Sequence, residues 1–462
     1  MTQGKGINWL ALFAIGIATV TIANDFSAIN VALPTMENDF DTNINTIQWV
    51  VNAYALTFGV MIVTGGRLAD MFGRRNAFFL GAAIFAVMSA AGGVAPTETF
   101  LIVTRALMGI GAALMLPAII GMTYALLPED KAGLAGGIIM GAAGLGNAIG
   151  PLIGGVFTDL LTWRWIFFLN VPIAAFAIGV IWWSVHLTEP DDSDHAIDYP
   201  GIAAISIGLV SLLVALDQVD DWGWGDPRVI ALLVIAVVGV SSFVPLERRA
   251  GRHALIPPAI IANREFAGPC VGILCLSATF FASLLYLPQF MESQLGFSPL
   301  ESGLGMVPAL ATFALVSFVA GPLYSRIGAK PLAVIGASCM CAAAVLFSLL
   351  DEGSSYGALV PGMVVLGIGV GSFYSTATTA GVTAIDESQA SLAGGIVYMF
   401  QIAGGSIGLG LTTTVFSANV PPFIDGFQAG FRLDAGIALV AVVISVLFVG
   451  GALVRKRATA PA

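Results

Sequence analysis

The sequence predicts an all-α membrane protein with fourteen transmembrane helices, arranged as two six-helix halves with two inserted helices between them. Three observations lead to this prediction. The chain of 462 residues is 57% hydrophobic and only 10% charged, whereas a soluble domain carries about 25% charged residues. Apolar runs of about 20 residues, long enough to cross a bilayer as helices, recur along the chain. Glycine-rich patterns of the first half also reappear in the second.

The apolar runs give the expected spans in chain order. The first run is too long for a signal-peptide core, so it is expected to remain as a span. We expect an N-terminal half at 1–188, a linker with the inserted spans at 189–262, and a C-terminal half at 263–462. The spans are placed at 8–33, 47–66, 77–95, 100–124, 133–158, 165–186, 199–216, 229–245, 267–290, 303–322, 331–350, 357–379, 394–417 and 432–453.

An internal repeat relates the two halves. Residues 132–139, Ala-Gly-Leu-Ala-Gly-Gly-Ile-Ile, align with residues 390–397, Ala-Ser-Leu-Ala-Gly-Gly-Ile-Val. The Gly-Ile-Gly at 109–111 aligns with the one at 367–369. Spans one to six therefore correspond to spans nine to fourteen. Two such parallel halves with a substrate site between them are a known transporter plan.

The distribution of lysine and arginine predicts the orientation in the membrane. With alternating spans, fourteen of the eighteen basic residues fall on the side that holds both termini, which indicates a cytoplasmic location for them. We therefore expect a multi-pass protein of the inner or plasma membrane, embedded in lipid as a monomer. The formal charge of −10 comes from acidic loops, so no nucleic-acid partner is expected. Residues 189–198 should form a solvated tether, and Trp222 and Trp224 should sit at the lipid interface in an outer loop at 217–228.

The most concentrated charge lies between the second and third expected spans. Residues 65–75 have the sequence Gly-Gly-Arg-Leu-Ala-Asp-Met-Phe-Gly-Arg-Arg and are expected to form a short charged turn. Gly66 and Gly73 would allow a tight turn and a close approach between helices. A partial copy occurs at 321–330, where the residues matching Gly66, Leu68, Gly73 and Arg75 are Gly321, Leu323, Gly328 and Lys330.

Two ionisable residues fall inside spans. Asp25 in span one and Arg105 in span four are both expected on the order of 10 Å below the outer surface, so they can meet if the spans are neighbours. A carboxylate in hydrocarbon is costly and is a candidate functional site. Arg105 would tune Asp25 between proton release and uptake. The alternatives are a structural carboxylate held by hydrogen bonds, and an arginine that extends to the interface or bonds main-chain oxygens.

A glycine ridge marks span five. Gly146, Gly150 and Gly154 are spaced by four and lie on one helix face, where they let another helix approach closely. Pro151 removes a backbone hydrogen bond. Tight static packing and a hinge are both compatible with this pattern.

Polar and aromatic side chains in or beside the spans are candidates for a substrate cavity, although ordinary packing explains most aromatic residues in a membrane protein. The candidates are Asn30, Gln48, Asn52, Tyr54, Tyr286, Gln289, Tyr374, Tyr398 and Gln401.

The sequence gives no indication of an enzyme. It lacks a phosphate-binding Gly-x-x-x-x-Gly-Lys-Ser/Thr loop, a metal-spaced His/Cys cluster and a nucleophile elbow. The four cysteines lie in apolar runs and are expected to behave as small hydrophobes. We expect no cofactor and no metal, with a proton gradient as the energy source.

Taken together, these motifs resemble those of the major facilitator superfamily, and within it the fourteen-span drug:proton antiporters. Residues 66–75 look like the superfamily's loop motif, 105–113 like the span-four motif, 25–34 like the span-one motif of the fourteen-span branch, and 163–172 like a further signature. Residues 146–155 resemble the antiporter motif of exporters. The resemblance implies an antiporter that exports amphipathic organic compounds in exchange for protons by alternating access. It implies roles for Asp25 and Arg105 in proton coupling, for Gly146, Gly150, Pro151, Gly154 and Gly155 in the antiporter motif, and for Gly66, Asp70, Gly73, Arg74 and Arg75 in a conformational latch.

Two departures from the family pattern concern the substrate. The acidic residue that some multication exporters carry in span ten is missing from 303–322, and Phe400 stands where a basic residue often precedes the glutamine of span thirteen. Both argue against strongly cationic drugs. The alternatives are a narrow-substrate exporter of a lipid, an amino acid or an antibiotic on the same fold, and a membrane sensor that transports nothing.

Overall fold

The computed structural model describes residues 7–185, 198–251 and 254–450. Within these ranges fourteen helices are long and apolar enough to cross a membrane, which confirms the predicted number. Short helices α2 (Ile44–Ile47), α10 (Pro258–Ala262) and α12 (Pro299–Gly305) lie between them. The long helices are α1 (Trp9–Asp39), α3 (Trp49–Phe72), α4 (Arg74–Gly93), α5 (Glu98–Leu126), α6 (Ala132–Leu160), α7 (Arg164–Ser184), α8 (Tyr199–Trp222), α9 (Pro227–Ala250), α11 (Arg264–Leu295), α13 (Val307–Ile327), α14 (Ala329–Ser348), α15 (Tyr356–Thr383), α16 (Ala390–Ser417) and α17 (Phe423–Phe448).

The helices form where apolar runs must satisfy their backbone groups internally, since hydrocarbon offers no hydrogen-bond partner. Polar side chains cap several helix starts. Thr97 accepts from the amide of Phe100 at the start of α5, and Ser298 and Glu301 form a capping box at the start of α12. These caps satisfy amides that the first helical turn leaves free.

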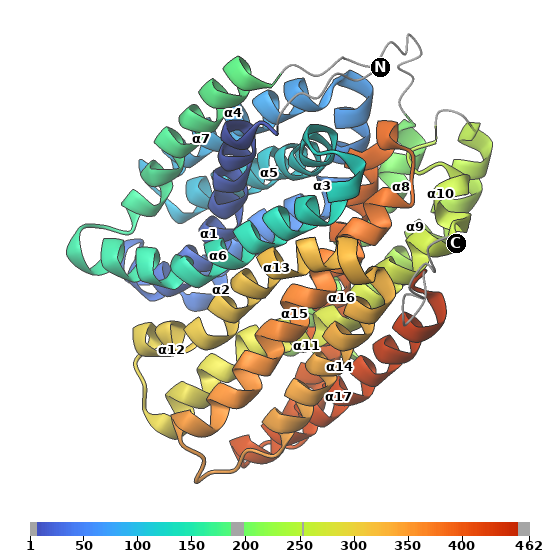
Figure 1. The fold of residues 1–462 in the computed structure, drawn as a ribbon. Helices are drawn as coiled ribbons and strands as arrows, with labels where there is room; N and C mark the ends of the chain where they lie inside the picture. Colours follow the sequence, from blue (N-terminus) through green and yellow to red (C-terminus); the bar gives the residue numbers. More distant parts are fainter. Residues whose placement is uncertain (1–6, 186–197, 252–253, 451–462) are drawn as a thin grey trace.

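Helices α1–α7 gather in one bundle and α11–α17 in another, in the upper and lower parts of Figure 1. The two bundles meet where α3 packs against α16 and α6 packs against α13 and α15. The inserted helices α8 and α9 pack on each other, and α8 also contacts α3 and α16. The first inserted helix therefore lies beside the seam between the bundles.

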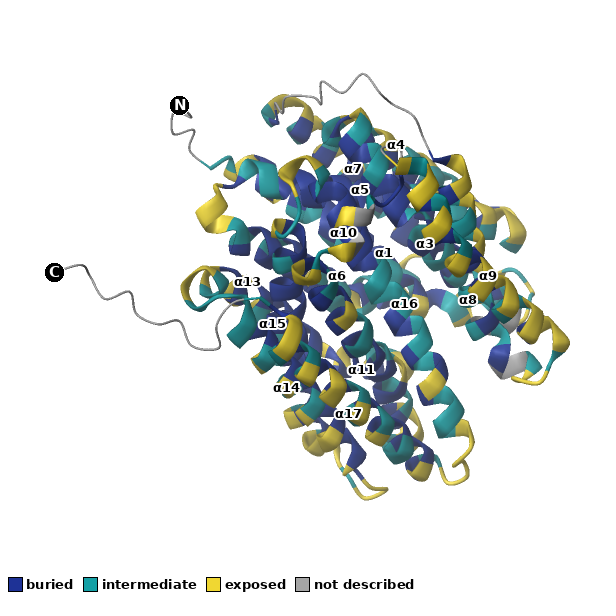
Figure 2. Cartoon of the chain, turned by 90° about the vertical axis from the view of Figure 1, so that its right-hand side faces the viewer, coloured by how far each residue is buried: buried dark blue, intermediate teal, exposed yellow. Residues whose placement is uncertain are grey.

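Buried residues concentrate along the bundle interiors, and exposed residues lie on the perimeter (Figure 2). Many of the exposed residues are large and apolar. Val237 on α9 is 66% exposed and Leu439 on α17 is 57% exposed. A soluble protein rarely exposes so much contiguous apolar surface. This perimeter is the surface that faces lipid.

The glycine ridge of α6 packs on α1. A Cβ atom at Gly154 would lie 2.3 Å from the main-chain oxygen of Ala28, and one at Gly146 would lie 2.5 Å from that of Val20. α6 runs unbroken through Pro151. The structure thus shows close packing of the helix that carries Asp25, and the hinge stays a prediction.

The expected charged turn at 65–75 is wrong in its extent. α3 continues to Phe72 and α4 starts at Arg74, so Asp70 lies on a helix and only Gly73 lies between the two. Gly73 has φ +95° and Gly328, its counterpart in the repeat, has φ +90°. Glycine adopts this region without steric cost, which explains why both copies of the motif keep it.

Two further expectations about helix ends are wrong. α17 starts at Phe423, nine residues before the expected 432, and α8 continues to Trp222, so the outer loop at 217–228 is mostly helical. The indole of Trp224 donates to the hydroxyl of Thr414 at 2.9 Å and ties this short connection to α16, where only a lipid-interface position had been expected. The tether at 189–198, all but its last residue, and the boundary at 188 lie outside the described residues.

The ridge yields a first prediction. Gly154→Ala should lower the free energy of unfolding of the purified protein by about 1–3 kcal/mol, because the added methyl group must separate two helix backbones. The matched control is Gly179→Ala on α7, where a Cβ atom would meet no atom within 4 Å. Thermal unfolding in detergent measures both. Equal stability of the two variants would contradict the close packing.

Candidate functional site

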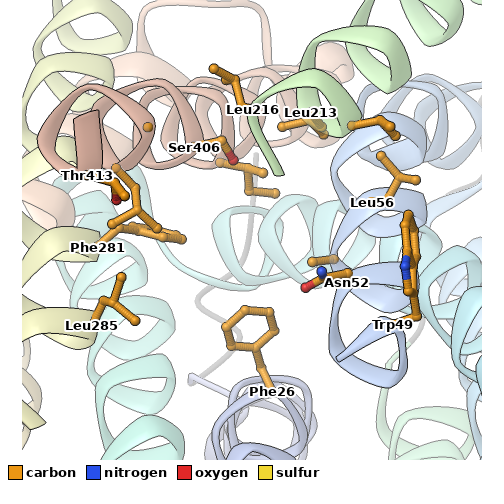
Figure 3. A pocket seen from close by; sticks show the side chains of 15 residues that line it. Phe26, Trp49, Asn52, Leu56, Leu213, Leu216, Phe281, Leu285, Ser406 and Thr413 are labelled. Carbon is orange, nitrogen blue, oxygen red and sulfur yellow. The ribbon is translucent and has the colours of Figure 1, made fainter. Parts of the chain in front are cut away.

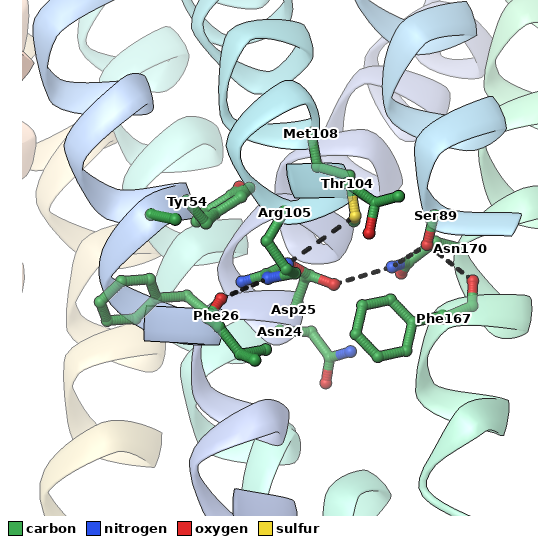
Figure 4. Close-up of polar contacts among 12 residues, drawn as sticks. Asn24, Asp25, Phe26, Tyr54, Ser89, Thr104, Arg105, Met108, Phe167 and Asn170 are labelled. Atoms are coloured by element: carbon green, nitrogen blue, oxygen red, sulfur yellow. Dashed lines mark hydrogen bonds and ion pairs between the residues drawn. The ribbon is translucent and has the colours of Figure 1, made fainter. Parts of the chain in front are cut away.

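Asp25 and Arg105 form a fully buried ion pair, with both side chains 0% exposed. Arg105 Nη1 donates to Asp25 Oδ2 (Figure 4). Its Nε donates to the main-chain oxygen of Val50 on α3 at 2.8 Å. The pair therefore joins α1, α3 and α5. Arg105 does not extend to the interface, so that part of the alternative is wrong, but it does bond a main-chain oxygen as the other part expected.

Asn170 on α7 completes the site and was not singled out from the sequence. Its amide donates to Asp25 Oδ1 at 2.9 Å and to the hydroxyl of Ser89 at 3.1 Å. Ser89 in turn donates to the main-chain oxygen of Phe167 at 2.8 Å. Asn170 lies in the 163–172 signature, which was the one available signal. Both oxygens of the carboxylate are thus bonded, as a buried charge requires.

Tyr54 lies between this ion pair and a cavity. The guanidinium of Arg105 stacks over its ring at 4.2 Å from the centroid, and the same ring lines a cavity of about 180 Å³. Phe26, the neighbour of Asp25 in sequence, lines the cavity as well. Among the described residues, the hydroxyl of Tyr54 and Nη2 of Arg105 have no hydrogen-bond partner. A shift of the ion pair would therefore act directly on the cavity wall.

A second cavity of about 290 Å³ adjoins the first and shares Phe26, Phe281 and Ile402 with it. Figure 3 shows Phe26 and Asn52 facing Phe281 and Thr413 across it. Its lining combines apolar side chains with neutral polar ones, and no charged side chain lines either cavity in the described part of the chain. Such a lining suits an amphipathic, uncharged molecule.

The structure brings four of the nine candidate cavity residues to these cavities: Asn52, Tyr54, Tyr398 and Gln401. The other five do not line these two cavities, and their place in a substrate cavity stays a prediction. Asn30 bonds back to the oxygen of Phe26, and Tyr374 is fully buried against Ser277. The Tyr286 hydroxyl donates to the hydroxyl of Thr413, which lines the larger cavity. Gln48 and Gln289 likewise lie away from both cavities.

The inserted helix contributes to the larger cavity, which sequence reasoning missed. Leu213, Val214 and Leu216 of α8 line it beside α3 and α16 (Figure 3). The repeat gave no signal for this, because α8 has no counterpart in either half.

Asp70 crosses from the N-terminal bundle to the start of α16. Its Oδ2 accepts from the amide of Leu392 at 2.7 Å and its Oδ1 from that of Ser391 at 3.2 Å. A carboxylate is favoured at a helix N-terminus, where free amides carry partial positive charge. Gly66 allows the approach, because a Cβ atom there would lie 2.6 Å from the oxygen of Ser391.

Arg74 extends the same contact, whereas Arg75 does not. Arg74 pairs with Asp70 at 3.2 Å, and its other nitrogens donate to the main-chain oxygens of Gly121 and Glu387. Arg75 donates to the oxygen of Trp182 on α7, within its own bundle. The expected latch therefore has Asp70 and Arg74 as its charged bridge, and Arg75 is not part of the bridge.

The remaining glycine-motif residues face short helix α12 and its surroundings. A Cβ atom at Gly155 would lie 2.6 Å from Leu300, and Pro151 approaches Gly303. Gly150 faces Ser27 on α1.

Among the described residues there is no group of three or more His, Cys, Asp or Glu side chains that could hold a metal ion.

Comparisons with known proteins identify the family. The model of the Major Facilitator Superfamily matches residues 15–409 and 269–461. The tetracenomycin C resistance and export protein of Streptomyces glaucescens is 30% identical, with 90% of this chain and 77% of the relative covered. The multidrug resistance protein Stp of Mycobacterium tuberculosis is 30% identical, with 88% and 76% covered. The human organic anion transporter MFSD10 superposes with a TM-score of 0.69 at 14% identity, over 96% of this chain and 100% of that one.

The last likeness concerns the fold alone. The match to the family model covers most of the chain. The chain therefore belongs to the Major Facilitator Superfamily of multi-pass membrane transporters.

Proposed function

We propose that the protein is a proton-coupled antiporter that exports amphipathic organic compounds by alternating access. The observation that carries this proposal is the fully buried Asp25–Arg105 pair, separated from an apolar cavity by the ring of Tyr54. Ionisable side chains within a membrane are costly, and in transporters they usually mark substrate or proton pathways. We therefore assign this ion pair to the transport cycle.

Protonation of Asp25 would drive the conformational change. A neutral Asp25 leaves the charge of Arg105 buried without its counter-ion, which is strongly unfavourable. Arg105 must then bond other acceptors, and its movement would displace the ring of Tyr54 on which it stacks. α1 must shift with it, and Phe26 on α1 lines both cavities. Proton binding would thus change the cavity that holds the substrate.

The Asp70 contact supports a closed cytoplasmic side in this state. If both termini are cytoplasmic, Asp70 and the start of α16 lie on the cytoplasmic side. The larger cavity, by contrast, is lined by Trp49 and Thr413, which lie near the opposite ends of α3 and α16. Closure at one end and a cavity toward the other correspond to one of the two states of alternating access.

The neutral cavity lining favours uncharged aromatic substrates. Phe26, Phe280, Phe281 and Phe313 line the smaller cavity, and its polar groups are amides and hydroxyls. Several relatives are named for single antibiotics, tetracenomycin C and puromycin among them. A narrow-substrate antibiotic exporter is therefore the second candidate, and a substrate panel separates it from a multidrug pump.

The ion pair generates the central prediction. Asp25→Asn should abolish export that depends on the proton gradient, and it should also destabilise the protein by about 3–5 kcal/mol, because Arg105 is left buried and unpaired. The double variant Asp25→Asn with Arg105→Met removes both charges and should recover stability without recovering gradient-driven export. Efflux of a fluorescent aromatic compound with and without a protonophore, together with thermal unfolding, measures both effects. Gradient-driven efflux by the stable double variant would rule out this pair as the proton carrier.

The latch generates a prediction about conformational populations. Asp70→Asn removes a carboxylate from the start of α16, an interaction worth up to ~2 kcal/mol in partly buried geometry, so the latch should open more often. A cysteine placed at the buried Ser391, in a background without the four native cysteines, should then react faster with a thiol reagent. Arg75→Gln is the matched control and should leave the rate unchanged, because Arg75 contacts only its own bundle. An unchanged rate in Asp70→Asn would show that its carboxylate does not hold this side closed.

The cavity generates a prediction about substrate charge. A neutral polycyclic aromatic compound should be exported more efficiently than ethidium, a permanent cation of similar size, because no described carboxylate lines the cavities. Phe281→Ala should lower efflux of the neutral compound several-fold, whereas Leu439→Ala on the lipid-facing surface should not. Preferential export of ethidium would contradict this assignment of substrate class.

A further inference from the structure

A second fully buried carboxylate lies in the C-terminal bundle. Asp434 on α17 is 0% exposed. The span expected at 432–453 placed Asp434 at a helix end, where a carboxylate would be solvated at the membrane surface. α17 in fact begins at Phe423, which puts Asp434 on the order of 16 Å along the helix from that end. It therefore lies at membrane depth.

No cationic side chain faces Asp434 from the helices that pack on α17. These are α11, α14 and α16. The charged residues of α11 and α14 lie at the helix ends, and α16 has none. On α17 itself, Arg432 is exposed and donates to Gln428. The neighbours that do face this turn are Thr412, Thr279 and the thiol of Cys341, which approaches the oxygen of Ala435 at 3.5 Å.

The repeat places Asp434 beside the counterpart of Asp25. Gly146 approaches the oxygen of Val20, and its repeat partner Gly404 approaches that of Leu274. The same offset along the helix pairs Asp25 with Thr279, whose hydroxyl lies 3.5 Å from the main-chain oxygen of Asp434. The repeat partner of Arg105 is Met363. The C-terminal bundle therefore has an acid at this place, supplied by its last helix, and no arginine.

The acceptor that the Thr412 hydroxyl can bond depends on whether Asp434 carries a proton. Thr412 Oγ1 lies 2.9 Å from Asp434 Oδ1 and 2.9 Å from the oxygen of Gly408. A hydroxyl has one hydrogen and can donate to only one of them. With Asp434 protonated, its O–H donates to Thr412 and Thr412 donates to Gly408. With Asp434 ionised, Thr412 must donate to the carboxylate, and the oxygen of Gly408 loses the bond from this hydroxyl.

The neutral form fits the remaining surroundings. Among the described residues, Asp434 Oδ2 has no hydrogen-bond partner. An ionised carboxylate with one neutral donor and no counter-charge is strongly disfavoured in apolar surroundings. These hydrogen bonds therefore favour a protonated Asp434 in the conformation that the structure shows.

The same turn of α16 reaches the larger cavity. Thr413, next to Thr412, lines that cavity and accepts from the hydroxyl of Tyr286 at 2.7 Å. A substrate that displaces Thr413 would move Thr412 with it. The substrate site and Asp434 are thus joined by two consecutive residues.

We propose that Asp434 is a second proton-binding residue, which takes up one proton from the side the cavity faces and releases it on the opposite side in each cycle. This inference rests on the proposed proton-coupled function. On release, the hydrogen of Thr412 turns to the carboxylate and its side-chain bond to the oxygen of Gly408 is lost, whereas the helical bond from the Thr412 amide stays. A threonine hydroxyl bonded to the oxygen four residues earlier favours a local bend, so α16 changes its bend where it packs on α11. Asp25 and Asp434 together would exchange two protons for each substrate, and the proton on Asp434 would be carried only when protonation of Asp25 drives the change of state, so Asp25→Asn stops both.

The variant Asp434→Asn separates this role from a structural one. Asparagine has the shape of the neutral acid and can still donate to Thr412, so a purely structural Asp434 tolerates it. We expect the ratio of proton flux to substrate flux in proteoliposomes to fall by half, with a flatter dependence of transport on the pH gradient. Asp425→Asn, an exposed position on the same helix, should keep the wild-type ratio. A wild-type ratio in Asp434→Asn overturns the inference.

Two measurements keep the test decisive. Absence of any proton flux in the unaltered protein rejects the proposed function itself, whereas coupled transport with an unchanged ratio in Asp434→Asn rejects only the role of Asp434. If Asp434→Asn does not fold, infrared difference spectra of Asp25→Asn decide instead. The C=O band of a protonated carboxyl group should change when the neutral aromatic substrate is added, and no change in this band overturns the inference.

Discussion

The arrangement of the N-terminal bundle depends on one constraint, that a charge in hydrocarbon must be paired and fully bonded. Asp25 meets it through Arg105 on α5 and Asn170 on α7, and Arg105 also bonds Val50 on α3. Four helices are thereby fixed around one carboxylate. The glycine ridge of α6 then holds α1 at close range, so the backbone that carries this carboxylate is packed tightly on α6.

The two bundles share a backbone plan but not its charges. Gly66 lies against Ser391 and Leu392 at the start of α16, and its counterpart Gly321 lies in the same way against Gly133 and Leu134 at the start of α6. The position of Asp70 is taken by Ser325, whose hydroxyl donates to the oxygen of Asp130. Of these two equivalent positions, the one on α3 carries a carboxylate and the one on α13 a hydroxyl. The proposed latch is therefore asymmetric, and protonation or charge removal at Asp70 would weaken the seam between α3 and α16 alone.

Much of this could be predicted from the sequence, because length and hydropathy determine membrane helices and the repeat relates the bundles. The meeting of Asp25 with Arg105 followed from their equal depth. The error at 65–75 has a physical cause: charge near Asp70 indicated a loop, but the amides of α16 satisfy that charge on a helix. Asp434 was missed because the start of α17 was placed nine residues too late. The position of α8 beside the larger cavity depends on how the helices pack, and no pattern in the sequence of α8 predicts this packing.

The separation of Asp25 from the cavity affects how the two transported species would be coupled. Asp25 and Arg105 are 0% exposed, so a substrate in the cavity does not touch the carboxylate and cannot compete with the proton for it. Coupling must then pass through shared conformational states, each favoured by one of the two ligands. Tyr54 would be the physical link in the proposed cycle, since it stacks on Arg105 and lines the cavity. Direct competition would require a cationic substrate to replace the proton, whereas coupling through Tyr54 places no demand on substrate charge. A neutral cavity lining is the arrangement that such indirect coupling permits.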